Sequence, residues 1–160
     1  MKLPRLLCLT KDSPNLSHAE QASLFCEGGA RFVQIRSKCL SFEEHLVDAA
    51  SVVRVCRKFD ACCIVNDSPE VALKIKANGV HLGNRDSTPE LARDLLGSEA
   101  IIGGTVNSLR EAENLLSKGV CDYAGVGPFR STCTKVNLAP ILSAEELREI
   151  IDYLSAIPSF

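Results

Sequence analysis

The sequence contains no tryptophan, a single methionine, and few aromatic residues, which make up 5% of its 160 positions. It also lacks any run of about 18 apolar residues, the length that a membrane-spanning helix requires. The short apolar segment at residues 6–9 is broken at once by Thr10-Lys11-Asp12, which argues against a secretory leader. We therefore expect a cytoplasmic protein, folded as one domain over residues 1–160.

Neither sign of charge predominates, because 18 Lys and Arg residues face 20 Asp and Glu residues, for a net charge of −2. A global field that attracts nucleic acid or an anionic membrane is excluded, so any anion site must be local. The eight cysteines show neither paired spacing nor a leader, which predicts reduced core residues. The adjacent Cys62 and Cys63 should point to opposite faces of a strand.

Short aliphatic runs alternate with amphipathic segments along the whole chain. The runs are almost continuously apolar, which indicates strands covered on both faces, as in a parallel sheet. Six such units predict either a (β/α)8 barrel of the TIM type or an open doubly wound sheet. The expected strands are residues 6–9, 32–36, 62–66, 79–82, 100–104 and 123–127, with a final stub at residues 156–158.

Four helix starts carry a serine followed three residues later by a glutamate. In this capping-box pattern, the serine oxygen and the glutamate carboxylate each accept a hydrogen bond from an amide of the first turn. The four pairs are Ser17 with Glu20, Ser41 with Glu44, Ser108 with Glu111, and Ser143 with Glu146.

The loops after the carboxyl ends of parallel strands gather at one face, where ligands bind. The second expected strand ends in Gln34-Ile35-Arg36-Ser37-Lys38, and alternation turns the amide and the two cations to the same side. Taken alone, this pattern fits a solvated strand end equally well.

Carboxylates follow the next two expected strands, at Asp67 and Asp86. Such a pair can share Mg²⁺, which prefers oxygen ligands. The alternative is that each aspartate only caps the helix that follows, since both precede a Ser or Thr and a Pro. The fifth strand exit offers the hydroxyl of Thr105 after two glycines.

The sixth strand runs into the loop GPFRSTCTK at residues 127–135, which combines hydroxyls with positive charge. Cationic, acidic and hydroxyl-bearing exits on one face describe a site for a diphosphate held through a metal ion. The exits carry no Ser/His/Asp set and no thiol beside a base. His18, His45 and His81 lie on expected helices or in a strand, which favours structural roles.

Four stretches resemble the thiamine-phosphate synthase family, in order and at similar spacing. They are GGARFVQIRSK (28–38), IVNDSPEVALKIKANGVHLGNRD (64–86), IIGGTVNSLREAENL (101–115) and CDYAGVGPFRSTCTK (121–135). The resemblance implies a (β/α)8 barrel and a transferase that joins hydroxymethylpyrimidine diphosphate to hydroxyethylthiazole phosphate, with release of diphosphate.

The resemblance also implies roles for individual residues. Asp67 and Asp86 would hold Mg²⁺, and Lys135, with Arg36 and Lys38, would act on the departing diphosphate. The implied substrate-binding residues are Gln34, Arg36, Lys38, Asn66 and Thr105 for the pyrimidine diphosphate, Thr132 and Thr134 for the thiazole phosphate, and Lys135. The partners are then small molecules, with no nucleic acid and no membrane.

Two departures from the family pattern leave alternatives open. Related thiazole tautomerases carry a histidine after strand five, where this chain has Asn107, so an isomerase is disfavoured. A (β/α)8 barrel usually needs at least 200 residues, so we expect about six units and an incomplete barrel. Either the sequence is a fragment or truncation, or another copy closes the gap in a homo-oligomer. A catalytically inactive module that binds or senses phosphate is the remaining alternative.

Overall fold

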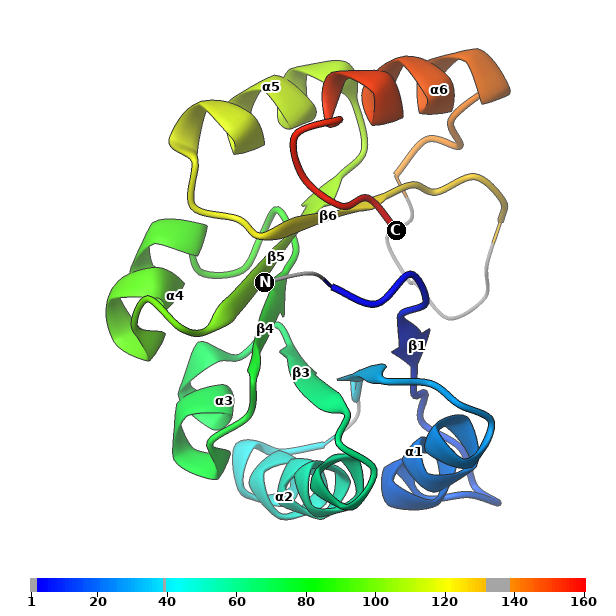
Figure 1. Cartoon of the computed structure of the whole chain (residues 1–160), viewed down its shortest axis with the longest axis vertical. Coiled ribbons are helices and arrows are strands. Elements are labelled where there is room, and N and C mark those ends of the chain that lie inside the picture. The colour runs from blue at the N-terminus through cyan, green and yellow to red at the C-terminus, as the bar shows by residue number, and fades with distance from the viewer. Residues whose placement is uncertain (1–2, 39, 132–138) are drawn as a thin grey trace.

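The computed structural model describes residues 3–38, 40–131 and 139–160, in which strands and helices alternate (Figure 1). None of the helices in these ranges is long and apolar enough to cross a membrane. The elements are β1 (Cys8–Leu9), α1 (His18–Glu27), β2 (Phe32–Ile35), α2 (Phe42–Lys58), β3 (Cys62–Asn66), α3 (Pro69–Ile75), β4 (Gly79–Leu82), α4 (Pro89–Leu96), β5 (Ile101–Val106), α5 (Leu109–Lys118), β6 (Tyr123–Val126) and α6 (Ala144–Tyr153).

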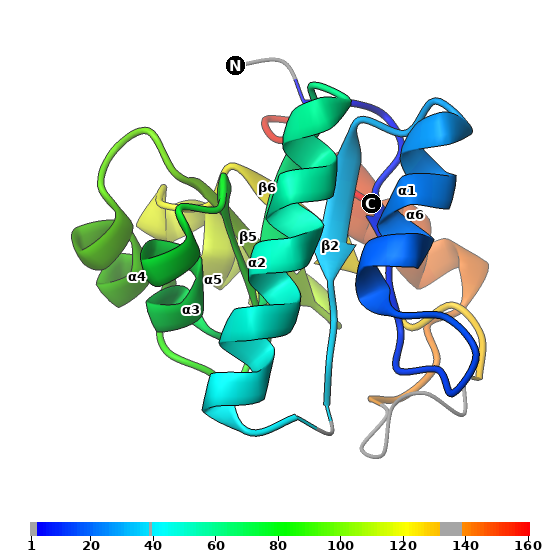
Figure 2. The ribbon, with the colours of Figure 1, turned by 90° about the horizontal axis from the view of Figure 1, so that it is seen from below.

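The six strands form one parallel sheet whose spatial order, β1 to β6, is the order along the chain. The sheet curls, and the helices cover its outer face (Figure 1). A doubly wound sheet would reverse its strand order at a switch point, so the barrel-type prediction is confirmed, as an incomplete barrel. The segments after β1, β2 and β6 leave the sheet at the same end (Figure 2).

Side chains alternate between the two faces of this sheet, as the strand period of two requires. On the outer face Val33, Cys63 and Val80 are buried against the helices. On the inner face Phe32 and Tyr123 are fully buried, and their rings meet edge to face with centroids 5.5 Å apart. The prediction for the two adjacent cysteines is confirmed, because Cys62 lies on the inner face and Cys63 on the outer one.

The capping boxes of α1, α2 and α6 form as predicted. At α5, the oxygen of Ser108 accepts from the N–H of Glu111 at 3.3 Å. The carboxylate of Glu111, however, accepts from the N–H of Asn107 at 2.6 Å. The box prediction is therefore only half right there, and Glu111 instead holds the backbone at the exit of β5.

Two strand boundaries differ from expectation in ways that matter for the site. The pairing of β5 continues to Val106, opposite Val126 of β6, so Thr105 lies within the strand and not in its exit loop. The final strand segment, expected at residues 156–158, instead pairs with β6 two residues further along the chain. Phe160 donates to the oxygen of Ala124 at 2.9 Å and Ser159 bridges Ala124 in parallel, which extends the sheet beyond β6.

Candidate functional site

Three charged side chains meet where β2, β3 and β4 end. Lys38 Nζ forms an ion pair with Asp67 Oδ2, and the carboxyl group of Asp86 lies beside that of Asp67, which raises its pKa. The N–H of Gly83 donates to Asp86 Oδ2 at 2.7 Å. The structure therefore brings together one predicted cation and both predicted metal ligands, although they are up to 48 positions apart in the chain (86 − 38).

The capping interpretation of the two aspartates is wrong. The N-cap of α3 is Ser68 and that of α4 is Thr88, and each side chain accepts from the first turn of its helix. Asp67 has a φ of 68°, a left-handed conformation that is uncommon outside glycine and that Asp tolerates better than most residues. Its N–H donates to the oxygen of His81 at 2.8 Å. Such conformations concentrate at ligand sites and persist where neighbouring contacts fix them.

The pKa of Asp86 is raised above its ordinary value of 3.8, mainly because burial disfavours the charged form, and further because of the Asp67 carboxyl group beside it. The Gly83 amide and the Lys38 ammonium act in the opposite direction. Two adjacent carboxylates that repel each other are an arrangement that a divalent cation relieves. The oxygen donors therefore fit a hard cation such as Mg²⁺.

We expect Asp86→Asn to raise the melting temperature at neutral pH in the presence of a chelator. In the folded parent chain, the carboxyl group of Asp86 binds its proton more tightly than it does in the unfolded chain. The free energy of unfolding therefore falls as pH rises through the range just above 3.8. Asparagine removes that dependence, while its oxygen can still accept from Gly83. Thermal unfolding between pH 3.5 and 7 tests this expectation. A variant less stable than the parent across that range would show that the carboxylate pair stabilises the fold without metal.

His81 connects the predicted substrate-binding residue Thr105, through Tyr123, with a second one, Gln34, across the inner face. Its Nδ1 lies 3.1 Å from the hydroxyl of Tyr123 and its Nε2 lies 3.0 Å from Oγ1 of Thr105. The rings of His81 and Tyr123 stack with centroids 5.4 Å apart. Burial raises the pKa of Tyr123, and a hydrogen bond from Gln34 partly opposes that rise. Gln34, Tyr123, His81 and Thr105 thus form one polar chain inside the barrel.

Sequence reasoning missed this connection, because it treated His81 as structural and did not consider the Tyr123 hydroxyl. A signal was present, since His81 alternates with Val80 and Leu82 and must point inward if those two face the helices. The inner position also explains the burial of Gln34, which is 2% exposed, and of Asn66, which is 6% exposed. Both lie at the carboxyl half of their strands, as predicted.

The exits of β5 and β6 are joined through Asn107. Its Nδ2 donates to the oxygen of Gly127, and its Oδ1 accepts from Asn84 at 3.3 Å. The Gly127-Pro128 peptide bond is cis. Thr132, Thr134 and Lys135 lie outside the described residues, so their predicted roles are not tested by the structure.

The described ranges contain no group of three or more His, Cys, Asp or Glu side chains that could hold a metal ion. Two carboxylates are nevertheless enough for Mg²⁺, which is commonly held by one or two of them together with phosphate oxygens and water. A groove of about 910 Å³ runs between α1 and α2 on the flank of the site, and Asp12, His18 and Asp48 are among its lining residues.

An incomplete parallel (β/α) barrel whose strand exits bring two carboxyl groups and a cation together places the chain in the class of (β/α)-barrel proteins. The chain is a member of the thiamine monophosphate synthase family, whose model matches residues 6–160.

Curated relatives and a solved structure agree with this membership. The thiamine-phosphate synthase of Bacteroides fragilis is 38% identical over 143 residues, covering 89% of this chain and 70% of the relative. That of Phocaeicola vulgatus is 37% identical over 150 residues, covering 94% and 72%. The thiamine phosphate pyrophosphorylase from Pyrococcus furiosus superposes with a TM-score of 0.83 at 31% identity, over 97% of this chain and 73% of that one.

Proposed function

We propose that this protein joins hydroxymethylpyrimidine diphosphate to hydroxyethylthiazole phosphate, forming thiamine phosphate and releasing diphosphate. Family membership supports the reaction, and the contact of Lys38, Asp67 and Asp86 is the observation that carries it to this chain. A charged group that must leave as diphosphate needs positive charge and a metal beside it. These three side chains supply the first and can hold the second.

The roles proposed for the described residues follow from where those residues lie, and the roles proposed for Thr132, Thr134 and Lys135 follow from family membership. Asp67 and Asp86 hold Mg²⁺, which when bound supplies positive charge to the diphosphate oxygens. Arg36 and Lys38 neutralise the leaving group from the β2 exit, and Lys135 is proposed to do so from the β6 exit. The other proposed substrate-binding residues are Gln34, Asn66 and Thr105 for the pyrimidine diphosphate, and Thr132 and Thr134 for the thiazole phosphate.

The polar chain through His81 suits recognition of the pyrimidine. It fixes the amide of Gln34 and the hydroxyl of Thr105 at the inner face through Tyr123 and His81. Buried, mutually bonded donors and acceptors keep their orientation when a ligand binds. As the carbon–oxygen bond to diphosphate breaks, the electron-rich aminopyrimidine carries the positive charge, and the thiazole nitrogen then attacks. The proposed reaction needs no protein nucleophile.

Product analysis with each substrate omitted in turn tests the proposal. We expect diphosphate and thiamine phosphate to form in equal amounts only with both substrates and Mg²⁺, and to stop when a chelator is added. Diphosphate released from the pyrimidine substrate alone would indicate hydrolysis. Isomerisation of the thiazole substrate alone would indicate a tautomerase. Binding of the pyrimidine diphosphate without any product would indicate an inactive binding module. Each of these three results would contradict the proposed function.

A further inference from the structure

The segment between β1 and α1 contributes none of the residues proposed above to bind substrate, yet its side chains hold the exit of β2. We propose that Thr10, Asp12 and His18 are positioning residues, which fix the backbone that presents Arg36 and Lys38 to the diphosphate. This inference rests on the proposed function, because it concerns the same anion site. It is carried by hydrogen bonds that end on the main chain of residues 36 and 38.

We refer to Thr10, Asp12 and His18 together as the bracket, and Thr10 is its first residue. It is 1% exposed, directly follows β1, and its N–H donates to the oxygen of Gln34 at 2.9 Å. Its Oγ1 accepts from the N–H of Arg36 at 3.2 Å and lies 2.6 Å from Nδ1 of His18. One buried side chain therefore ties the end of β2 to the start of α1.

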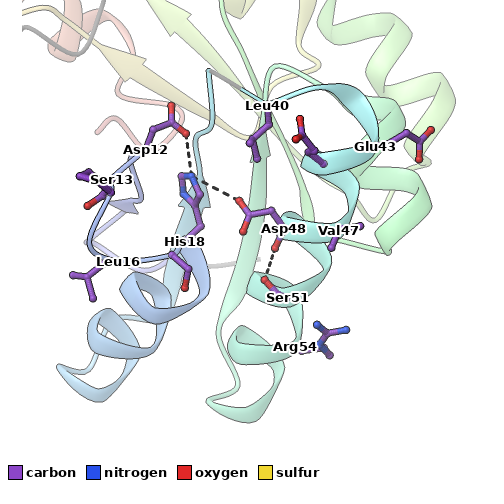
Figure 3. Close-up of a pocket in the computed structure, with 13 residues that line it drawn as sticks. Asp12, Ser13, Leu16, His18, Leu40, Glu43, Val47, Asp48, Ser51 and Arg54 are labelled. Atoms are coloured by element: carbon purple, nitrogen blue, oxygen red, sulfur yellow. Dashed lines mark hydrogen bonds and ion pairs between the residues drawn. The ribbon is translucent and has the colours of Figure 1, made fainter.

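Asp12 holds the next two residues of the β2 exit. Its Oδ2 accepts from the N–H of Lys38 at 3.0 Å, and its Oδ1 accepts from the hydroxyl of Ser37 at 2.9 Å. The same Oδ1 lies 3.2 Å from Nε2 of His18 (Figure 3). Partial burial alone would raise the pKa of Asp12, but the hydrogen bonds from Lys38, Ser37 and His18 lower it below its ordinary value. The carboxylate is thus ionised at neutral pH and acts only as an acceptor.

The ionised carboxylate fixes the direction of the remaining bonds. Because Asp12 can only accept, Nε2 of His18 carries the proton that points to it. In the neutral ring Nδ1 then accepts from the hydroxyl of Thr10, whose lone pair remains available for the N–H of Arg36. Asp48 Oδ2 lies 3.7 Å from the same Nε2 (Figure 3). His18, 6% exposed, therefore locks Thr10 and Asp12 in the orientations that hold the β2 exit.

The bracket bears directly on the anion site because Lys38 is fixed at both ends. Its N–H is held by Asp12, and its ammonium reaches Asp67, beside Asp86. A displacement of the main chain at residues 36–38 would move both cations relative to the carboxylates. Misplacement of charge-stabilising groups by about 1 Å can reduce turnover by 10²-fold. If Thr10, Asp12 and His18 only supported the fold, their loss would not affect specifically the substrate that Arg36 and Lys38 bind.

Thr10→Val and Thr10→Ser form a matched pair that tests the bracket. Valine keeps the shape of threonine but leaves the N–H of Arg36 without its acceptor, whereas serine keeps the hydroxyl. We expect Thr10→Val to lower kcat/KM for the pyrimidine diphosphate about ten-fold and to weaken binding of inorganic diphosphate with Mg²⁺ by a similar factor. The KM for the thiazole phosphate should stay within about two-fold, and Thr10→Ser should behave like the parent.

Two further variants separate positioning from stability. Asp12→Ala changes a half-exposed residue and is expected to reproduce the losses of Thr10→Val even if that variant folds poorly. Ser17→Ala removes the N-cap of α1, destabilises the same region, and touches no residue of the β2 exit. Ser17→Ala should lower the melting temperature but bind inorganic diphosphate as the parent does.

Calorimetry with inorganic diphosphate and Mg²⁺ then gives a decision that does not depend on turnover. Parent-like binding by both Thr10→Val and Asp12→Ala overturns the bracket, as does equal weakening by Ser17→Ala. If the parent forms no product but both variants still bind diphosphate more weakly than the parent, the proposed function fails and the positioning role stands. If the parent binds no diphosphate at all, both the proposed function and the positioning role are wrong.

Discussion

Asp67→Asn is expected to reduce formation of thiamine phosphate on the order of 10²-fold, the largest effect on activity predicted from the described residues. Asp67 contacts both Lys38 and Asp86, so its removal takes away a metal ligand and the partner that holds a cation in place. Losses of this size are typical when one preorganised group that stabilises developing charge is removed. Initial rates at saturating substrates and graded Mg²⁺ measure the loss.

Asparagine is the informative substitution at this position because the φ of Asp67 is 68°. Asparagine tolerates the left-handed conformation as well as aspartate does, whereas alanine would add backbone strain and confuse the comparison. Asp94→Asn, at an exposed position of α4, serves as the matched control and should leave the rate unchanged. If Asp67→Asn kept the rate and the Mg²⁺ dependence of the parent, the proposed metal site would be wrong.

Gly103→Ala is expected to have the largest effect on stability, a loss of about 3 kcal/mol. A Cβ at this position would lie 2.1 Å from Cζ of Tyr123 and 2.5 Å from its hydroxyl oxygen. The ring cannot move aside freely, because Phe32 and Phe160 pack against it at centroid distances of 5.5 Å. Urea unfolding followed by far-UV circular dichroism measures the loss.

Two comparisons show whether the collision with Tyr123 is the cause. Gly28→Ala adds a Cβ that meets only ordinary contacts at 3.4 Å, and its φ is −72°, so its stability should change by less than about 1 kcal/mol. In the double variant Gly103→Ala/Tyr123→Leu, the new methyl group has space, so the two losses should not add. Additive losses would trace the effect of Gly103→Ala to something other than the tyrosine ring.

Most of the fold could be predicted from the sequence because its signals are local. Apolar runs mark the strands, and Ser17, Ser41 and Ser143 mark helix starts with oxygens that the helices use. The boundary of β5 was missed because its two glycines read as a strand exit. Packing against β6 continues the strand through them, an interaction between segments that sequence spacing does not reveal.

The site was predictable only as far as strand exits gather at one end of a parallel sheet. That rule brought Lys38, Asp67 and Asp86 together correctly. It could not show that Asp67 takes a left-handed conformation, nor that His81 reaches Thr105 and Tyr123, since side-chain direction across the interior depends on curvature and register. The roles of Thr132, Thr134 and Lys135, closure by a second copy, and a single domain over residues 1–160 stay predictions.

The strand order described above also has a consequence for how the molecule forms. Each strand after β1 pairs with its predecessor along the chain, so contact order is low for a parallel sheet, and strand pairing closes only one short loop at a time. Synthesis from the amino end should let each βα unit dock on the one already made. The cations that follow β2 would then be in place before the carboxylates that follow β3 and β4 emerge.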